Sequence, residues 1–384
     1  MSDNIKFGLA IPQGWRGGDF PLEEENDPVS QYEFSKSIAT TADNLNFNSI
    51  YAYDHLIPHY KDDIQKNIFE CFTLLSATAA ITEKIKIGQI VVCNSYRNPS
   101  LLAKMLSTLD IISNGRVELG IGAGWYEQEY LAYGYDFPSN ITRIMQLEES
   151  ISIIKAMWTD NNNNKHVSFQ GKYYRVKDAI CNPKPIQKPY PPIMIGGSGE
   201  RYLLKVVAKH ADRYNLFFGS PDEMKRKISL LKEYCKSIGR DYKKDIEYSV
   251  VLPCIIRESE DEVSNVLVQN KRNDKTIEQY TQYLVNGIAI GTPEKIMRGI
   301  SKYVDVGVRH FVIHFIGLND ATLRLFDSKV IRMIQQILCD AIIITITIIT
   351  MFISLHLLRS KSKYTQMLGH GTVGVESRCM SICI

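Results

Sequence analysis

Residues 85–125 read IKIGQIVVCNSYRNPSLLAKMLSTLDIISNGRVELGIGAGW, and this stretch decides the fold. Its segments 85–92 and 117–121 are short apolar runs rich in β-branched residues, whereas residues 100–112 carry apolar side chains three and four positions apart. Continuous apolar runs are typical of parallel strands that are buried on both faces, and the spacing between them indicates a helix. The stretch therefore predicts one strand–helix–strand unit.

The same alternation extends toward both ends of the chain. Six further apolar runs predict strands at 7–12, 48–53, 192–195, 214–218, 247–256 and 310–315. Helical patterns lie at about 28–44, 68–82 and 140–158. Eight strand–helix units that end near residue 338 fit a (β/α)8 TIM barrel in length and in count. A doubly wound open sheet is the alternative that this pattern leaves open.

One segment interrupts the alternation. Residues 160–192 read DNNNNKHVSFQGKYYRVKDAICNPKPIQKPYPP, with an asparagine run, a Gln170-Gly171 turn and a proline-rich end. The turn lies between VSF and KYYRV, which predicts an exposed β-hairpin followed by a return to the fifth strand. We interpret residues of about 160–191 as an insertion within a single domain of residues 1–338, because no linker marks a boundary.

Residues 339–384 form an atypical tail. Its segment 341–358, AIIITITIITMFISLHLL, has eighteen residues without a charge, which is the lower limit for a helix that spans a bilayer. Basic residues flank it on both sides, so the charge pattern predicts no orientation. A membrane anchor, an aberrant extension and an aggregation-prone strand are three interpretations that the sequence leaves open.

The composition narrows the class of protein. Hydrophobic residues make up 45% and charged residues 23%, as in ordinary globular proteins. Four of the 45 basic and one of the 42 acidic residues follow residue 340, so residues 1–340 carry 41 of each and no nucleic-acid partner is predicted. The eight cysteines are scattered without a CxxC pair and the N-terminus is no signal peptide, so we expect a cytoplasmic protein with reduced thiols. No grouping has metal-ligand spacing, and no GxSxG motif occurs.

Unusual residues gather where four of the predicted strands end, and in a barrel the reactive groups lie at these ends. His55 follows the second strand and can donate a hydrogen bond to a ligand, with the adjacent Asp54 to orient or charge it. The third strand runs into hydrogen-bonding side chains at 93–95. The fourth strand leads into the third of these segments, a glycine cluster at 120–124 that a flat ligand can approach, followed by Trp125.

The fourth of these segments is Gly196-Gly197-Ser198-Gly199, between the fifth strand and a helix. Backbone N–H groups, the helix dipole and the Ser198 hydroxyl together favour one phosphate group, although a plain tight turn is the other interpretation.

In this order the four segments resemble the luciferase-like monooxygenase superfamily, from about residue 6 to residue 335. They are most similar to the branch of oxidoreductases that depend on coenzyme F420, a 5-deazaflavin. The resemblance implies hydride transfer between coenzyme F420 and a small organic substrate. An FMN-dependent monooxygenase that uses reduced flavin and O2 is the first alternative, and a non-catalytic flavin-binding barrel is the second. Homodimers are common in the family, so a homodimer is one expectation. Attachment to a membrane is expected only if segment 341–358 is an anchor.

The resemblance also implies roles for single residues. His55 and Asp54 would be the catalytic pair at the reactive face of the ring. A non-prolyl cis peptide that is frequent in the family matches the bond Ile90–Val91 and would back the ring. The implied cofactor contacts are Ile90, Val91, Asn94, Gln128, Gly196, Gly197 and Ser198. Trp125 stands where some sugar-phosphate dehydrogenases of this group have an acid, which puts that substrate in doubt.

Overall fold

The computed structural model describes residues 5–15, 19–21, 27–59, 66–159, 166–271, 275–284, 287–337, 339–340 and 350. The chain divides into two units, residues 1–334 and 335–384. Apart from Thr350, the predicted hydrophobic segment 341–358 lies outside the described residues, so its three interpretations stay predictions. Within the described part of the chain, no helix is long and apolar enough to cross a membrane.

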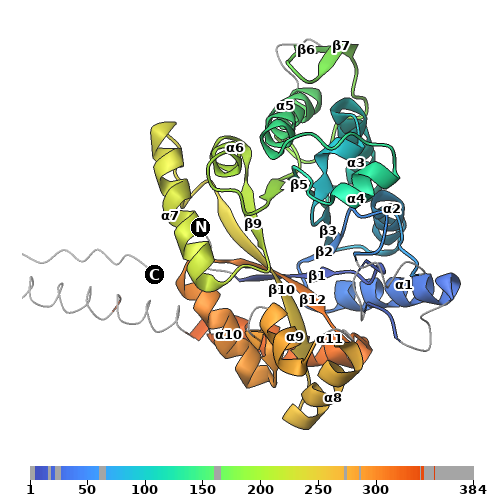
Figure 1. Cartoon of the computed structure of the whole chain (residues 1–384), viewed down its shortest axis with the longest axis vertical. Coiled ribbons are helices and arrows are strands. Elements are labelled where there is room, and N and C mark those ends of the chain that lie inside the picture. Colours follow the sequence, from blue (N-terminus) through green and yellow to red (C-terminus); the bar gives the residue numbers. More distant parts are fainter. Residues whose placement is uncertain are drawn as a thin grey trace, which may run out of the picture. The chain divides into compact units, whose positions relative to one another are not determined.

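Eight parallel strands close into a barrel in the first unit (Figure 1). Each strand pairs with its neighbours in chain order, and the last pairs with the first, with Phe7 opposite Phe311. This closure confirms the predicted (β/α)8 barrel and excludes the open sheet. The barrel strands are β1 Lys6–Ala10, β2 Ser49–Ala52, β3 Lys86–Gln89, β5 Val117–Gly122, β8 Ile193–Gly196, β9 Arg213–Phe217, β10 Glu247–Ile256 and β12 His310–Phe315.

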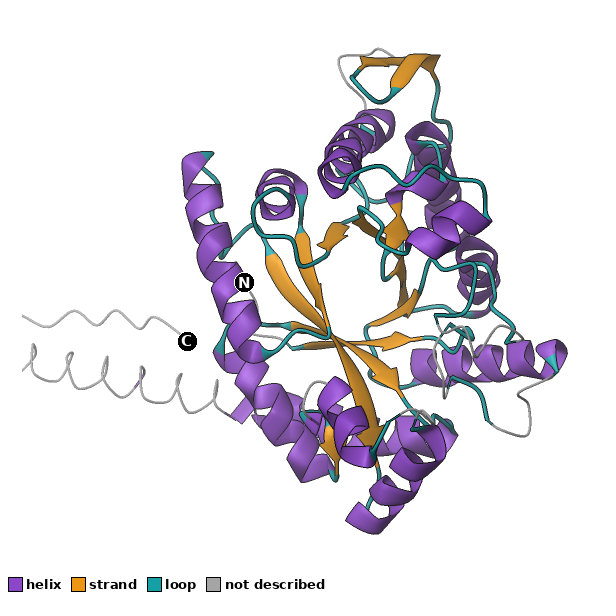
Figure 2. Cartoon of the chain, viewed as in Figure 1, coloured by secondary structure: helices purple, strands orange, loops and turns teal. Residues whose placement is uncertain are grey.

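Helices surround the barrel (Figure 2). Several begin where a side chain accepts hydrogen bonds from the first turn, as Asp27 does from the N–H groups of Val29 and Ser30. The helices are α1 Pro28–Asn44, α2 Cys71–Ile81, α3 Pro99–Ile112, α5 Asn140–Trp158, α6 Leu203–His210, α7 Pro221–Ser237, α8 Glu260–Asn270, α10 Pro293–Asp305 and α11 Asp320–Phe326. Five short elements were not predicted: β4 Val92–Cys93, η3 Asn94–Tyr96, α9 Ile277–Tyr283, β11 Ile290–Gly291 and η5 Asp327–Ile331. The short helix α4 Glu127–Ala132 follows β5.

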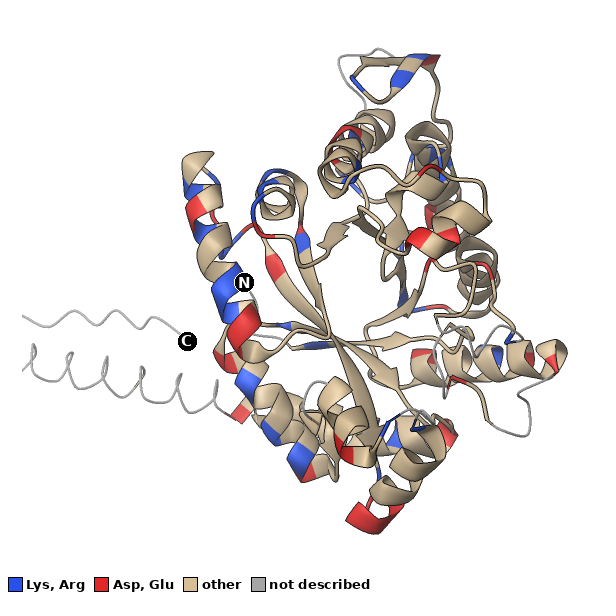
Figure 3. Ribbon diagram, viewed as in Figure 1, with Lys and Arg blue, Asp and Glu red and all other residues tan. Residues whose placement is uncertain are grey.

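The predicted hairpin is present as β6 Val167–Gln170 and β7 Arg175–Ala179, which pair antiparallel. Its turn is tied to α5, because the Glu149 carboxylate accepts hydrogen bonds of 2.8–3.0 Å from the backbone N–H groups of residues 172–174. Lys and Arg lie among Asp and Glu over the outer helices, in keeping with the balanced charge of residues 1–340 (Figure 3).

A buried polar network occupies the barrel where the strands begin. Arg213 contacts the carboxylates of Glu118 at 2.8 Å and Glu247 at 2.6 Å, and the Tyr51 hydroxyl at 3.1 Å. Tyr51 in turn donates to Glu118. His310 lies beside this group with its ring nitrogens at hydrogen-bond distance from neighbouring hydroxyls. Each charge is thus compensated in the barrel interior, which burial requires.

This network predicts how stability depends on pH. Burial, with the charge of Arg213, lowers the pKa of His310 to about 3 from its usual 6.5. As the pH falls below 6.5, His310 binds a proton in the unfolded chain but stays neutral in the folded chain. The free energy of unfolding should therefore fall by about 1–2 kcal/mol between pH 7 and pH 5. Burial raises the pKa values of Glu118 and Glu247, but Arg213 outweighs it and lowers both to about 2. Their stabilisation should be lost as the pH falls below 4.5.

Urea unfolding at pH 7, 5 and 4 checks this expectation. The variant His310→Asn keeps hydrogen-bonding groups but cannot titrate, so its stability should fall less than that of the unaltered protein between pH 7 and pH 5. The fall that remains is expected from His210, because burial lowers its pKa to about 4. An equal loss of stability in both proteins over that range would contradict the assignment to His310.

Candidate functional site

A cavity of about 440 Å³ opens where the barrel strands end, within the range typical of ligand sites. All four predicted strand-end segments contribute to its lining. Residues 53–55 come from the end of β2, 90–93 from the end of β3, 122–126 from the end of β5 and 196–199 from the end of β8. Further lining residues are Trp15, Tyr96, Glu129, Asn140, Ile144, Leu203, Asn215 and Phe217.

The structure brings most of the implied site residues to this cavity, but not all of them. Those that line it are Asp54, His55, Ile90, Val91, Gly196, Gly197 and Ser198. Asn94 and Gln128 are not among the lining residues. Asn94 is buried, donates to the Tyr174 hydroxyl at 3.2 Å, and its Oδ1 has no hydrogen-bond partner among the described residues. Gln128 is exposed on α4, where it accepts a hydrogen bond from Tyr126.

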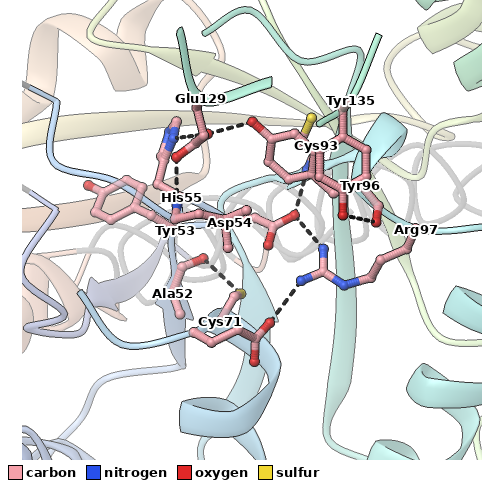
Figure 4. Close-up of polar contacts among 12 residues, drawn as sticks. Ala52, Tyr53, Asp54, His55, Cys71, Cys93, Tyr96, Arg97, Glu129 and Tyr135 are labelled. Carbon is pink, nitrogen blue, oxygen red and sulfur yellow. Dashed lines mark hydrogen bonds and ion pairs between the residues drawn. The ribbon is translucent and has the colours of Figure 1, made fainter. Parts of the chain in front are cut away.

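Two residues hold the His55 imidazole, and Figure 4 shows one of them, Glu129. Its face stacks on Trp15, with ring centroids 3.9 Å apart and planes 3° from parallel. Its Nδ1 lies 2.9 Å from Oε2 of Glu129. The expectation that Asp54 orients the imidazole is therefore wrong, because the carboxylate in contact with the ring comes from α4. Neither Trp15 nor Glu129 was singled out for this position from the sequence.

Glu129 is a buried carboxylate whose oxygens are saturated. It accepts from His55, from the backbone N–H groups of Leu56 and Ile57 at 2.5 and 3.1 Å, and from the Tyr96 hydroxyl at 2.6 Å. Burial raises the pKa of Glu129, but the hydrogen bond from His55 and the other donors outweigh it, and the pKa lies below its usual value. The ionised carboxylate therefore places the Nδ1 proton and leaves Nε2 for the cavity side.

Asp54 has a structural task of its own. Its Oδ2 accepts from Arg97 at 2.7 Å and from the backbone N–H of Cys93 at 2.9 Å, so it ties the end of β2 to β4 and η3. Arg97 also contacts Glu70 at 2.8 Å. Burial raises the pKa of Asp54, although Arg97 opposes the shift. Its Oδ1 is buried without a hydrogen-bond partner among the described residues.

The Ile90–Val91 peptide is cis, as the resemblance implied. The glycines around it allow chain segments to approach closely. A Cβ on Gly122 would lie 2.9 Å from the Val91 side chain, and one on Gly196 would lie 3.0 Å from it. A Cβ on Gly120 would overlap the carbonyl oxygen of Gln89. Gly120 thus serves the packing of β5 on β3, and of the three glycines in the cluster at 120–124 only Gly122 and Gly124 are among the lining residues of the cavity.

Basic side chains gather at the Gly196–Gly199 loop. Lys227 on α7 is buried, donates to the Ser198 carbonyl, and lies 3.0 Å from Glu200. Arg226 contacts the same carboxylate at 2.8 Å. These residues are far from the loop in sequence, and only the packing of α7 beside α6 reveals them.

A closed (β/α)8 barrel with a cavity, a held imidazole and a glycine-rich loop at the strand ends is typical of a cofactor-dependent barrel enzyme. The chain belongs to the luciferase-like monooxygenase family, whose model matches residues 18–283. Its relatives are F420- or flavin-dependent oxidoreductases and monooxygenases, and this protein is an enzyme of that class. The family predicted from the sequence is thereby confirmed.

Two relatives in this family depend on different cofactors, one on FMNH2 and one on F420. An FMNH2-dependent dimethylsulfone monooxygenase of Pseudomonas putida is 28% identical over 269 residues, 70% of each chain. An F420-dependent glucose-6-phosphate dehydrogenase of Microbacterium testaceum is 26% identical over 319 residues, 77% of this chain and 91% of the relative.

Solved structures share the fold. An F420-dependent secondary alcohol dehydrogenase in complex with an F420-acetone adduct has a TM-score of 0.68 at 18% identity, covering 85% of this chain and 98% of that one. EDTA monooxygenase from Chelativorans sp. BNC1 has a TM-score of 0.70 at 15% identity, covering 87% and 94%. These likenesses show that the barrel fold of this chain is shared with both enzymes.

Proposed function

We propose that this enzyme transfers a hydride between coenzyme F420 and a small organic substrate. The observation that carries the proposal is one cavity lined both by His55 and by the loop Gly196-Gly197-Ser198. An imidazole for proton transfer and a backbone-rich loop for a phosphate are thus available to a single bound molecule.

The residues present fit a tricyclic cofactor. Ile90, Val91, Gly122 and Gly196 give the cavity a smooth aliphatic and backbone surface against which a flat ring can lie. Gly196, Gly197 and Ser198 would hold the phosphate. Asn94 would satisfy its unpartnered Oδ1 by accepting a hydrogen bond, and the exposed Gln128 would contact an outer part of the cofactor.

Basic residues near the loop support F420 as the proposed cofactor, although Glu200 forms ion pairs with two of them. A deazaflavin carries a lactyl-glutamate tail beyond its phosphate, and FMN ends at the phosphate. Three basic residues lie near the loop Gly196–Gly199. Arg201 follows it in the chain, and Arg226 and Lys227 come from α7 and contact Glu200. A basic group at this place supports binding of a polyanionic tail.

When bound, the deazaflavin supplies the hydride chemistry. The protein's own part is to hold and move a proton and to exclude water. Glu129 and Trp15 fix the His55 ring, so that its Nε2 donates or accepts the proton at the substrate. Asp54 and Arg97 brace the strand ends on which the site is built.

An anaerobic fluorescence titration with F420 and with FMN tests the proposal. We expect tighter binding of F420 and at least tenfold weaker binding by Gly197→Ala. Gly197 has φ +138°, and a Cβ there would lie 2.6 Å from the Leu203 side chain, so the substitution should distort the loop. Gly239→Ala is the matched control, because Gly239 has φ +71° with nothing within 4 Å of its Cβ and lies at the end of α7.

The outcomes separate the candidate functions. Tighter binding of FMN, together with oxygen consumption by the reduced enzyme, would favour an FMN-dependent monooxygenase, for which the Pseudomonas putida relative is the precedent. Binding of neither cofactor would refute both.

A further inference from the structure

A continuous row of aromatic rings forms one side of the cavity. We call it the aromatic wall, and it consists of Trp15, His55, Trp125, Tyr126 and Phe217, all of which line the cavity. Neighbouring rings are in contact along the row. Phe217 and Trp15 have centroids 6.4 Å apart, His55 and Trp125 lie 6.0 Å apart edge to face, and Trp125 stacks on Tyr126 at 5.1 Å.

Two rings of the aromatic wall are unusually exposed for their size. Trp125 is 55% exposed and Phe217 is 36% exposed, whereas the third tryptophan of the chain, Trp158, is 1% exposed. Large aromatic rings that line a cavity and remain open to solvent gain contact area when a ligand covers them. Stacking of a ligand ring adds roughly threefold to tenfold in affinity beyond the area that is buried.

The charges at the cavity disfavour an anionic substrate. Its described lining includes the carboxyl groups of Asp54 and Glu129 but no Lys or Arg. Arg97, which is not among the lining residues, forms ion pairs with both Asp54 and Glu70. A phosphate or carboxylate on the substrate would therefore enter beside the ionised Glu129 without a cation from the described lining to compensate it.

We propose that the aromatic wall binds the substrate, and that the substrate is a molecule with a planar aromatic ring and no negative charge. This rests on the proposed function in one respect, because the backbone-rich remainder of the cavity is assigned to the cofactor. The enzyme would then differ from its sugar-phosphate relatives in substrate class while sharing their fold. Trp125 is the specificity-determining residue, since it contributes the most exposed ring of the wall.

Calorimetric titrations of the full-length protein test this inference with ligands that share one ring system and differ in charge. The probes are 2-naphthamide, 2-naphthoate and 2-naphthylmethylammonium, with glucose 6-phosphate as the sugar phosphate. Each is titrated into the protein alone and into the protein loaded with its cofactor. We expect 2-naphthamide and 2-naphthylmethylammonium each to bind at least tenfold more tightly than 2-naphthoate, and glucose 6-phosphate to show no binding.

Three variants locate the binding site. Trp125→Ala and Phe217→Leu should each weaken 2-naphthamide binding at least fivefold and change cofactor affinity less than twofold. Leu131→Ala is the control, because Leu131 is an exposed apolar residue of α4 outside the cavity lining, and it should change neither.

Each other outcome has a definite meaning. Tighter binding of the naphthoate or of glucose 6-phosphate than of 2-naphthamide would overturn the substrate class, and so would absence of any binding. Loss of cofactor affinity in Trp125→Ala with unchanged 2-naphthamide binding would assign the wall to the cofactor and overturn the proposal. Binding of 2-naphthamide by a protein that takes up neither F420 nor FMN would refute the proposed function but support the aromatic site.

Discussion

Replacing His55 by Ala should lower kcat by about 10²–10⁴-fold, measured with whichever substrate supports turnover of the unaltered enzyme. Two residues fix the orientation of the imidazole: Trp15 stacks on its face, and the carboxylate of Glu129 contacts its Nδ1. The phosphate of the cofactor is assigned to the Gly196–Gly199 loop, which the substitution does not change, so the Kd of the cofactor should change less than threefold. The two readouts are steady-state turnover and anaerobic fluorescence titration on the same preparation.

His166→Ala is the control for the loss of an imidazole, because His166 is exposed next to the β6–β7 hairpin. Its turnover and cofactor affinity should equal those of the unaltered enzyme. If His55→Ala retained full turnover, the imidazole would have no part in the chemistry. If the unaltered protein bound the cofactor but turned over no substrate of any class, the non-catalytic flavin-binding barrel would be the better description.

Replacing Arg213 by Met should lower the free energy of unfolding by about 3–5 kcal/mol. The guanidinium lies between Glu118 and Glu247 inside the barrel, and Met would leave both carboxylates buried without their shared cation. Because the cost arises from uncompensated charge, adding Glu118→Gln to the Arg213→Met variant should restore part of the stability. Urea unfolding at pH 7 measures both effects.

Arg324→Met is the control on an exposed ion pair of the same length. Arg324 lies 2.6 Å from Asp320 on α11, but both side chains are more than half exposed. An exposed pair contributes little, so this variant should lose less than about 1 kcal/mol. Equal losses in the two arginine variants would show that burial of the network does not determine its contribution.

The sequence predicted the barrel because buried parallel strands and their covering helices differ in local pattern. The apolar runs at 85–92 and 117–121 and the helical spacing between them are visible without any tertiary information. The hairpin at 160–191 was also predictable, since Gln170-Gly171 is a local turn signal. Short elements such as β4 and β11 were missed, because two residues carry too little periodicity to be recognised.

The site was only partly predictable for the same physical reason. The predicted strand ends indicated which residues follow a strand. They therefore predicted that His55 and Gly196–Ser198 lie at the same end of the barrel. It could not tell which of several nearby carboxylates reaches the imidazole, since Asp54 is adjacent in sequence but turns toward Arg97.

Contacts between residues far apart in the chain depend on packing, which no local pattern encodes. Trp15 comes from the loop after β1 and Glu129 from α4, yet both touch His55 at the end of β2. The sequence by itself thus determined the fold, the family and the end of the barrel that carries the site. The tertiary structure decided which side chains hold the imidazole and which rings form the aromatic wall, because closure of the barrel brings those distant segments together.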